Sequence, residues 1–131
     1  MKKVLGASIF IVLLFVLVLQ VYSKGEKPPE AVFLRKVYNF GEIKEGEKVS
    51  TIFLLKNKGD SDLIINDIRV SCGCTAVLLS SKIIEPGKTA ELKVTFDSKG
   101  FKGEIRKSIY VHSNDTRHPI IQLRIESKVL S

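Results

Sequence analysis

The sequence predicts an all-β fold: an immunoglobulin-like antiparallel β-sandwich of seven to eight strands, preceded by an N-terminal hydrophobic helix for export or anchoring. Three observations lead to this prediction. After residue 24, short runs of alternating apolar and polar residues fill the chain, turn residues separate these runs, and no window shows a helical period of about 3.6 residues. The length of 131 residues leaves room for one such domain.

Residues 1–23 have the pattern of a signal peptide or an N-terminal transmembrane anchor. Lys2 and Lys3 precede an apolar run that continues to Leu19, and positive residues before such a run direct export. Cleavage ahead of Lys24 would remove the segment. Without cleavage, residues 4–22 come close to the roughly 20 residues that span a bilayer and would hold the protein at the membrane. In both cases we expect the remaining chain to be exported, to the periplasm or the outer face of the cytoplasmic membrane.

A polar linker is expected at residues 24–31, where Pro28 and Pro29 stiffen the chain. The predicted immunoglobulin-like domain then covers residues 32–131. Its first strands are expected at residues 33–34 and 37–40, and a turn at 41–47 with two glycines follows them. Residues 48–56 carry apolar side chains on both parities, which predicts a strand covered on both faces. The next turn, at residues 57–60, contains residue types that tolerate a positive φ.

The middle of the chain is expected to continue in the same way. Residues 62–71 form a strand whose apolar residues change parity, which predicts a bulge near Asn66 and Asp67. A short strand at 75–79 and a turn at 85–88 follow.

The last strands are the most regular ones. Residues 89–96 alternate without a fault, so one face of this strand is expected to be buried and the other wet. After a loop at 98–103, residues 104–113 alternate again, and the final strand is expected at 121–129.

The charge of the exported part argues against a nucleic-acid partner. The chain has 21 basic and 14 acidic residues, and removing Lys2 and Lys3 leaves 19 basic and 14 acidic residues after position 23, a net charge of +5. The basic residues are spread in pairs with acids close by, which is typical of a solvated surface rather than a nucleic-acid groove.

Cys72 and Cys74, the two cysteines of the chain, are separated only by Gly73. In an extended strand their Cβ atoms would be too far apart for a disulfide, but a positive φ at Gly73 would bring the side chains together. An exported location favours oxidation, and a ring closed over one residue would be strained and easily reduced. The pair is therefore a candidate disulfide or redox pair. Its closest cations in sequence are Arg69 and Lys82, and no nearby basic residue is evident that would lower the pKa of a thiol.

Two other interpretations of the cysteine pair stay open. Cys72 and Cys74 are candidate metal ligands, because two thiolates on one side of a turn suit Cu(I). Zinc would also need His112 and His118, although the cysteine spacing is shorter than usual for zinc and each histidine is expected at the surface. In the third interpretation the cysteines are small, mostly buried residues at a crossing between sheets, where Gly73 permits close backbone approach.

A set of motifs resembles the bacterial DUF1573 family over about residues 33–129. The resemblance rests on Phe40-Gly41-Glu42-Ile43, Glu45-Gly46-Glu47, Phe53, Asn57, Gly59, Ser71-Cys72-Gly73-Cys74-Thr75, Pro86-Gly87, Phe96-Asp97-Ser98, Gly100, Gly103 and Ser113-Asn114. It implies an immunoglobulin-like fold akin to major sperm protein, PapD-type chaperones and Hydin-type domains. It implies no activity, because the family is one of unknown function.

These observations favour a non-enzymatic binding or structural module of the bacterial cell envelope. No catalytic residues and no cofactor are predicted, and we expect a protein partner in the envelope, bound along an open strand edge. The membrane is a second contact, through the N-terminal segment if it is uncleaved. The alternative is a periplasmic copper-binding or thiol-redox protein that uses Cys72 and Cys74.

Overall fold

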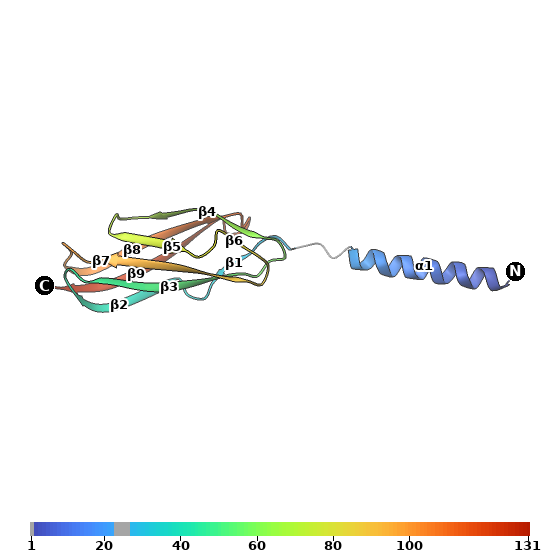
Figure 1. Cartoon of the computed structure of the whole chain (residues 1–131), viewed down its shortest axis with the longest axis horizontal. Helices are drawn as coiled ribbons and strands as arrows, with labels where there is room; N and C mark the ends of the chain where they lie inside the picture. Colours follow the sequence, from blue (N-terminus) through green and yellow to red (C-terminus); the bar gives the residue numbers. More distant parts are fainter. Residues whose placement is uncertain (1, 23–26) are drawn as a thin grey trace.

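The protein is described by a computed structural model that covers residues 2–22 and 27–131. One helix, α1 (Lys2–Tyr22), precedes a domain made of strands (Figure 1). The strands are β1 (Ala31–Phe33), β2 (Val37–Lys44), β3 (Lys48–Asn57), β4 (Leu63–Val70), β5 (Thr75–Leu79), β6 (Ile83–Ile84), β7 (Thr89–Asp97), β8 (Gly103–Ser113) and β9 (Ile120–Leu130). The sequence predicts seven to eight strands and the structure has nine. The prediction misses β6 because two residues are too few to form an alternating pattern.

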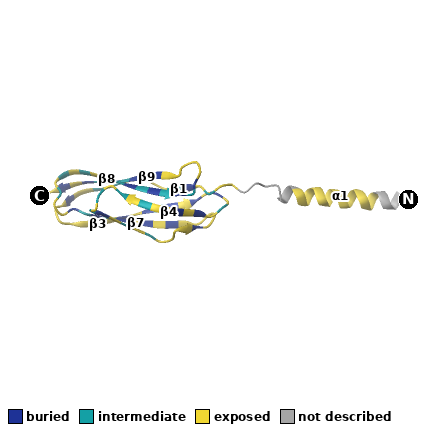
Figure 2. Cartoon of the chain, turned by 90° about the horizontal axis from the view of Figure 1, so that it is seen from above, coloured by how far each residue is buried: buried dark blue, intermediate teal, exposed yellow. Residues whose placement is uncertain are grey.

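Helix α1 contains the predicted export segment. The large apolar residues at positions 9–19 are exposed, and this part of α1 has the colour of exposed residues in Figure 2. The predicted cleavage position ahead of Lys24 lies outside the described residues. Among the helical residues that the structure describes, none form a stretch with the length and hydropathy required to cross a membrane.

The strands form two sheets that pack face to face, as the sequence predicts (Figure 1). The four-stranded sheet has the order β1-β3-β7-β5, and the five-stranded sheet has the order β2-β9-β8-β4-β6. One pair departs from the predicted antiparallel arrangement, because β2 and β9 run parallel, with Val37 opposite Arg124 and Lys44 opposite Leu130. The sequence could not indicate this pair, since parallel strands are joined by long connections rather than by a local turn.

The core lies between the sheets and is built by the inward positions of the strands (Figure 2). The alternation predicted for β7 is confirmed, and each buried large side chain contributes about 1.5–3 kcal/mol. In β3, however, Ile52 is exposed and Leu54 half-buried, so the prediction of two covered faces is wrong. The outer face of the four-stranded sheet is a surface of the sandwich. The largest fully buried apolar side chains are Phe53, Leu55, Leu63, Leu92, Val94, Phe96, Ile109, Leu123 and Ile125.

Two strands contain bulges. The register of β4 shifts between Ile65 and Asp67, which confirms the predicted bulge. The register of β2 shifts between Asn39 and Glu42, around Gly41 with a φ of 74°. Gly41 therefore bends the strand without ending it, and β2 continues to Lys44 through residues that the sequence analysis places in a turn.

The two ends of the sandwich differ in what they contain. At the end that we call proximal, Ala31 lies opposite Asn57 and the N-terminal part of the chain enters the domain. At the opposite end, called distal, Lys48 lies opposite Asp97, and the C-terminus of the chain is found there (Figure 1).

The segment at residues 27–30 is hydrogen-bonded to the proximal end. The N–H of Lys27 donates to Asp60 Oδ2 at 3.1 Å, and the N–H of Lys58 donates to the carbonyl of Glu30 at 2.9 Å. These residues belong to the predicted linker, yet they are part of the folded domain. The domain therefore extends N-terminally to Lys27.

Gly59 fits the proximal end for a reason other than the expected one. Its φ is not positive, and the same holds for the other residues of the predicted turn at 57–60. A Cβ on Gly59 would instead overlap the carbonyl oxygen of Pro28 and lie 2.7 Å from Pro29 Cα. The glycine is required by the close approach of two backbone segments.

Candidate functional site

Ser71-Cys72-Gly73-Cys74 carries the chain from one sheet to the other at the distal end. β4 belongs to the five-stranded sheet and β5 to the four-stranded sheet, so the predicted crossing between sheets is present. The N–H of Thr75 donates to the carbonyl of Cys72 at 3.2 Å, which closes a tight turn. The N–H of Asp97 donates to the carbonyl of Cys74 at 2.9 Å and fixes the start of β5 against β7.

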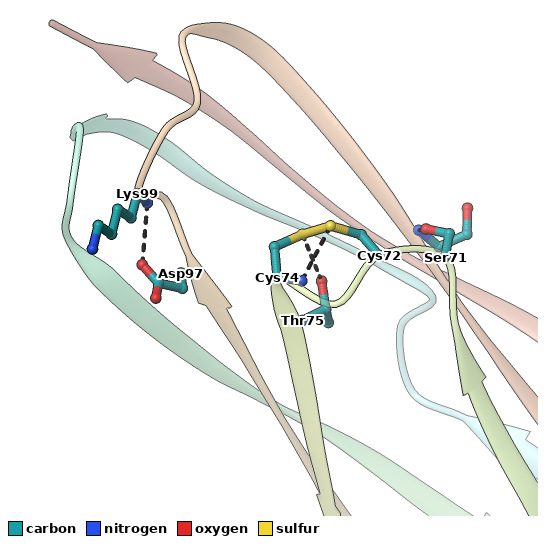
Figure 3. Close-up of a disulfide and its surroundings, with 7 residues drawn as sticks. Ser71, Cys72, Cys74, Thr75, Asp97 and Lys99 are labelled. Carbon is teal, nitrogen blue, oxygen red and sulfur yellow. Dashed lines mark hydrogen bonds between the residues drawn. A yellow bond between two sulfur atoms is a disulfide. The ribbon is translucent and has the colours of Figure 1, made fainter.

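The two cysteines are joined by a disulfide within this turn (Figure 3). The Sγ atoms are 2.09 Å apart and the Cα atoms 5.2 Å apart. The N–H of Cys74 points at Cys72 Sγ at 3.1 Å, and Cys74 Sγ lies 3.7 Å from Thr75 Oγ1. Both cysteines are half-buried, and Cys74 packs against the hydrophobic core. The pair is less buried than expected of purely structural residues.

Gly73 does not act in either of the ways that the sequence analysis expects. Its φ is not positive, and a Cβ placed on it would have no atom within 4 Å. The turn between Cys72 and Thr75, rather than a special conformation of Gly73, brings the two sulfurs together. Because Gly73 has no side chain, the space beside the turn at this position stays open.

The two histidines lie away from the cysteines. His112 lies opposite Asp67 in the sheet. Asp67 precedes Cys72 by five residues, which at about 3.3 Å per residue corresponds to ~16 Å along the chain. The N–H of His118 donates to Asp115 Oδ1 in the loop before β9. Over residues 2–22 and 27–131 there is no group of three or more His, Cys, Asp or Glu residues that could hold a metal. Binding of Cu(I) by the cysteines alone would first require reduction of the disulfide.

The cations nearest to the pair in sequence have other surroundings. Arg69 Nε donates to Asp67 Oδ2 at 2.9 Å, and this hydrogen bond lowers the pKa of Asp67 below its ordinary value. Lys82 lies in the connection between β5 and β6, where its carbonyl accepts a hydrogen bond from the N–H of Ile65 at 2.8 Å. Among the hydrogen bonds of the described residues, those of the two sulfurs involve Cys74 N–H and Thr75 Oγ1 rather than either cation.

A groove runs beside the crossing, between the edges of β4 and β5. It has a volume of about 310 Å³ and mainly apolar walls. We call it the β4–β5 groove. It is lined by Ile65, Asn66, Asp67, Ile68, Val77, Leu78, Leu79 and Lys82. The sequence predicts an open strand edge but not which one, because edge positions depend on the order of strands in the sheets.

The sequence did not indicate the roles of two buried polar residues at the proximal end, Asn57 and Asp115. Asn57 is fully buried, and its Nδ2 donates to the carbonyls of Ser61 at 2.7 Å and Ile84 at 2.9 Å. Its Oδ1 accepts from the N–H groups of Gly59 and Glu30. All hydrogen-bonding capacity of this amide is used to hold backbone, so Asn57 is structural.

Asp115 has a similar role and an altered acidity. Its side chain accepts hydrogen bonds from the backbone N–H groups of Ala31, Arg117 and His118 at 2.9–3.1 Å. Burial of the carboxylate would raise its pKa, but these hydrogen bonds, with the charge of His118, outweigh burial and lower the pKa of Asp115 below its ordinary value. In the sequence, Asn114-Asp115-Thr116 indicates only a loop between two alternating segments.

Comparisons with known proteins agree with the fold described above. The family described as protein of unknown function, DUF1573, matches residues 31–129. No curated protein matches the chain. A protein of unknown function from Porphyromonas gingivalis is similar in structure, with a TM-score of 0.70, 16% identity, and coverage of 78% of this chain and 47% of that chain.

Two further solved structures have a similar fold. The PapD-like domain 7 of human CEP192 has a TM-score of 0.59 and 14% identity, with coverage of 79% of this chain and 87% of that chain. The YadV chaperone has a TM-score of 0.56 and 13% identity, with coverage of 77% of this chain and 52% of that chain. The chain spans about half the length of the Porphyromonas gingivalis protein and of YadV. At these identities the likeness concerns the fold alone.

Proposed function

Because the chain belongs to the DUF1573 family, whose description is that of a protein of unknown function, we propose its role from its own geometry. The protein is a non-enzymatic module of the bacterial cell envelope that binds another protein. The observation that carries this proposal is the β4–β5 groove, which lies between two neighbouring sheet edges and where Leu78 is exposed while Val77 and Leu79 are half-buried. Open strand edges and apolar grooves are surfaces by which domains hold extended chain segments.

The buried polar groups support a structural rather than a catalytic design. The side chains of Asn57 and Asp115 form their hydrogen bonds with backbone groups at the proximal end. Ser98 Oγ donates to the carbonyls of Lys44 and Glu47, and Ser127 Oγ donates to that of Gly41. These side chains brace loops and strands and do not point toward a common cleft.

The N-terminal segment supports the proposed envelope location. Lys2 and Lys3 before an apolar run direct export, and an exported compartment suits the disulfide between Cys72 and Cys74. We expect alkaline phosphatase fused after Ser131 to be active in cells. Activity of a cytosolic reporter at the same position, with inactive phosphatase, would overturn the location.

Photocrosslinking in intact cells tests the binding role. Benzoylphenylalanine is placed at Leu78 in the groove, and at Leu34 and Gln122 on other exposed surfaces. We expect one protein of the envelope to form an adduct from one of these surfaces and not from all three. The absence of adducts from all three positions, in cells where the exported reporter is active, would contradict a binding role.

A second candidate function rests on the disulfide, which is half-buried at the distal end (Figure 3). In thiol exchange, a dithiol of a second protein would give two electrons and two protons to Cys72 and Cys74 and itself become a disulfide. After incubation with reduced glutathione, alkylation and intact mass measure the reduced fraction. The reduced protein, with Cys72→Ser as control, is then weighed after addition of Cu(I). A bond that resists glutathione, together with no Cys72-dependent copper, would eliminate this second function.

A further inference from the structure

The sandwich has four edge strands, and they are unequally protected against pairing with another chain. β1 has three residues and β6 two, which are too short to serve as templates. β2 has a bulge around Gly41 and charged residues along its second half. β5 has five uncharged residues, Thr-Ala-Val-Leu-Leu, with a regular register against β7. Bulges, charged residues and short length are the usual protections of an edge strand. β5 has neither a bulge nor a charged residue, and only its short length protects it in part.

The backbone of β5 presents unpaired groups to the groove. Cys74 and Ser80 are both hydrogen-bonded to β7, through Asp97 N–H to Cys74 O and Ser80 N–H to Glu91 O. In an antiparallel pair, residues alternate between facing the partner strand and facing away from it. Ala76 and Leu78 therefore face β7 with their N–H and C=O groups, and those of Val77 and Leu79 face the open edge.

The neighbouring edge of β4 is less suited than β5 to pair with an added strand. β6 occupies only the start of β4, opposite Leu63 and Ile64. Beyond that point β4 has its bulge and the ion pair of Asp67 with Arg69, which disfavour a new partner on that strand. The two edges thus form one groove, but β5 is the strand that can accept an added strand.

The side chains around the β5 edge indicate what such a strand would contain. Leu78 is 70% exposed on the outer face, and Val77 and Leu79 are half-buried on the inner side. A strand beside β5 would place alternate side chains next to these two groups. Apolar residues at alternating positions would therefore cover Leu78 on one face and the walls of the groove on the other.

Charge distinguishes between a second copy of this chain and a different protein. Lys82 lines the groove, and in the described part of the chain no acidic group lies within ion-pair distance of it. Two copies paired along β5 would bring together domains that each carry a charge of +5, counted as 19 basic and 14 acidic residues. A strand with a carboxylate beside Lys82 complements this charge, whereas a second copy does not.

We propose that the edge of β5 binds an extended segment of another protein as an added strand, with alternating apolar residues and an acidic residue beside Lys82. This inference rests on the proposed binding function and specifies its surface and ligand chemistry. The added strand would extend the four-stranded sheet to the order β1-β3-β7-β5-ligand. It would satisfy the N–H and C=O groups of Val77 and Leu79.

A displayed library of random ten-residue peptides, selected on the full chain in mild detergent, tests the proposal. We expect enriched peptides to alternate apolar and polar residues and to contain Asp or Glu near one end. Hydrogen exchange of the complex should show protection of the amides of Val77 and Leu79. Enrichment without alternation, or protection on another strand, overturns the proposal.

Two substitutions sharpen this test. Leu78→Lys should weaken binding of the selected peptides by at least about tenfold, because it places a charge against the apolar ligand. The control Leu34→Lys, at a side chain that is 74% exposed in another part of the surface, should change it less than about twofold. Equal effects of the two substitutions would contradict binding at β5.

A charge exchange tests the role of Lys82. Lys82→Glu should weaken the selected acidic peptides, and replacing their acid by Lys should restore binding to this variant. If peptides bind but protection maps to β1 or β2, or if Lys82→Glu has no effect, the binding function stands and this inference fails. The inference also fails if no peptide is enriched while photocrosslinking at other surfaces gives an adduct. If there is neither an enriched peptide nor an adduct, the proposed function is contradicted as well.

Discussion

The carboxylate of Asp115 accepts a hydrogen bond from the backbone N–H of Ala31 at 3.0 Å, across 84 positions of sequence. This bond joins the entry of the domain to the loop between β8 and β9. The same carboxylate also binds the N–H groups of Arg117 and His118. One buried charge therefore fixes the first strand and a late loop at the proximal end.

Removal of this carboxylate should destabilise the domain. Asp115→Ala leaves three backbone N–H groups without their acceptor, and we expect a loss of about 3 kcal/mol in the free energy of unfolding. Urea denaturation followed by circular dichroism measures it. Asp60→Ala, which removes an exposed acceptor from Lys27 N–H, is the matched control and should cost less than about 1 kcal/mol. A loss of the same size in both variants would contradict the role given to Asp115.

The lowered pKa of Asp115 predicts a dependence of stability on pH. Because the folded-state pKa is below the unfolded value, the unfolded chain binds the proton more readily. The stabilisation is therefore present above the unfolded pKa of about 3.9 and is lost as the pH falls from there through the folded pKa. Urea titrations at a series of pH values should show a smaller acid loss in Asp115→Asn than in the parent. An identical acid profile in the two proteins would place the effect on other carboxylates.

Gly59 and Gly73 should respond in opposite ways to the same substitution. Gly59→Ala drives a Cβ into the backbone of Pro28 and Pro29, and we expect a loss of about 2 kcal/mol or more. Gly73→Ala places its Cβ in open space without a positive φ, and the change should stay within about 0.5 kcal/mol. Thermal unfolding measures both variants. A large loss in Gly73→Ala would mean that the turn of the cysteines needs its glycine after all.

Loss of the disulfide should have a modest effect on stability. The bond closes a loop over one intervening residue, so the entropy it removes from the unfolded chain corresponds to about 1.5 kcal/mol. Cys72→Ser with Cys74→Ser should lower the free energy of unfolding by that amount and leave the circular dichroism spectrum unchanged. A domain that fails to fold without the bond would show that the crossing from β4 to β5 depends on it.

The sequence predicted those elements whose signals are local. β5 has the predicted bounds, β7 alternates as expected, and the parity change of β4 marked its bulge. The sandwich followed from the same patterns, whereas the crossing between sheets was only one of the three interpretations of Cys72 and Cys74. Each of these depends only on which residues neighbour one another along the chain.

The features that the sequence did not predict depend on residues far apart in the chain. The parallel pair of β2 and β9, the role of Gly59 against Pro28, and the contact of Asp115 with Ala31 all join distant segments. No periodic pattern encodes such contacts. The identity of the open edge was also hidden, because it depends on the order of strands in both sheets.

The parallel pairing of β2 with β9 has a consequence for synthesis. The ribosome releases β2 early, yet the strand that completes its sheet is the last to emerge. The five-stranded sheet cannot close on a nascent chain that lacks β9, so the apolar faces of the earlier strands stay exposed until then. In a chain with this order of strands, β2 can join the five-stranded sheet only after residues 120–130 have been made.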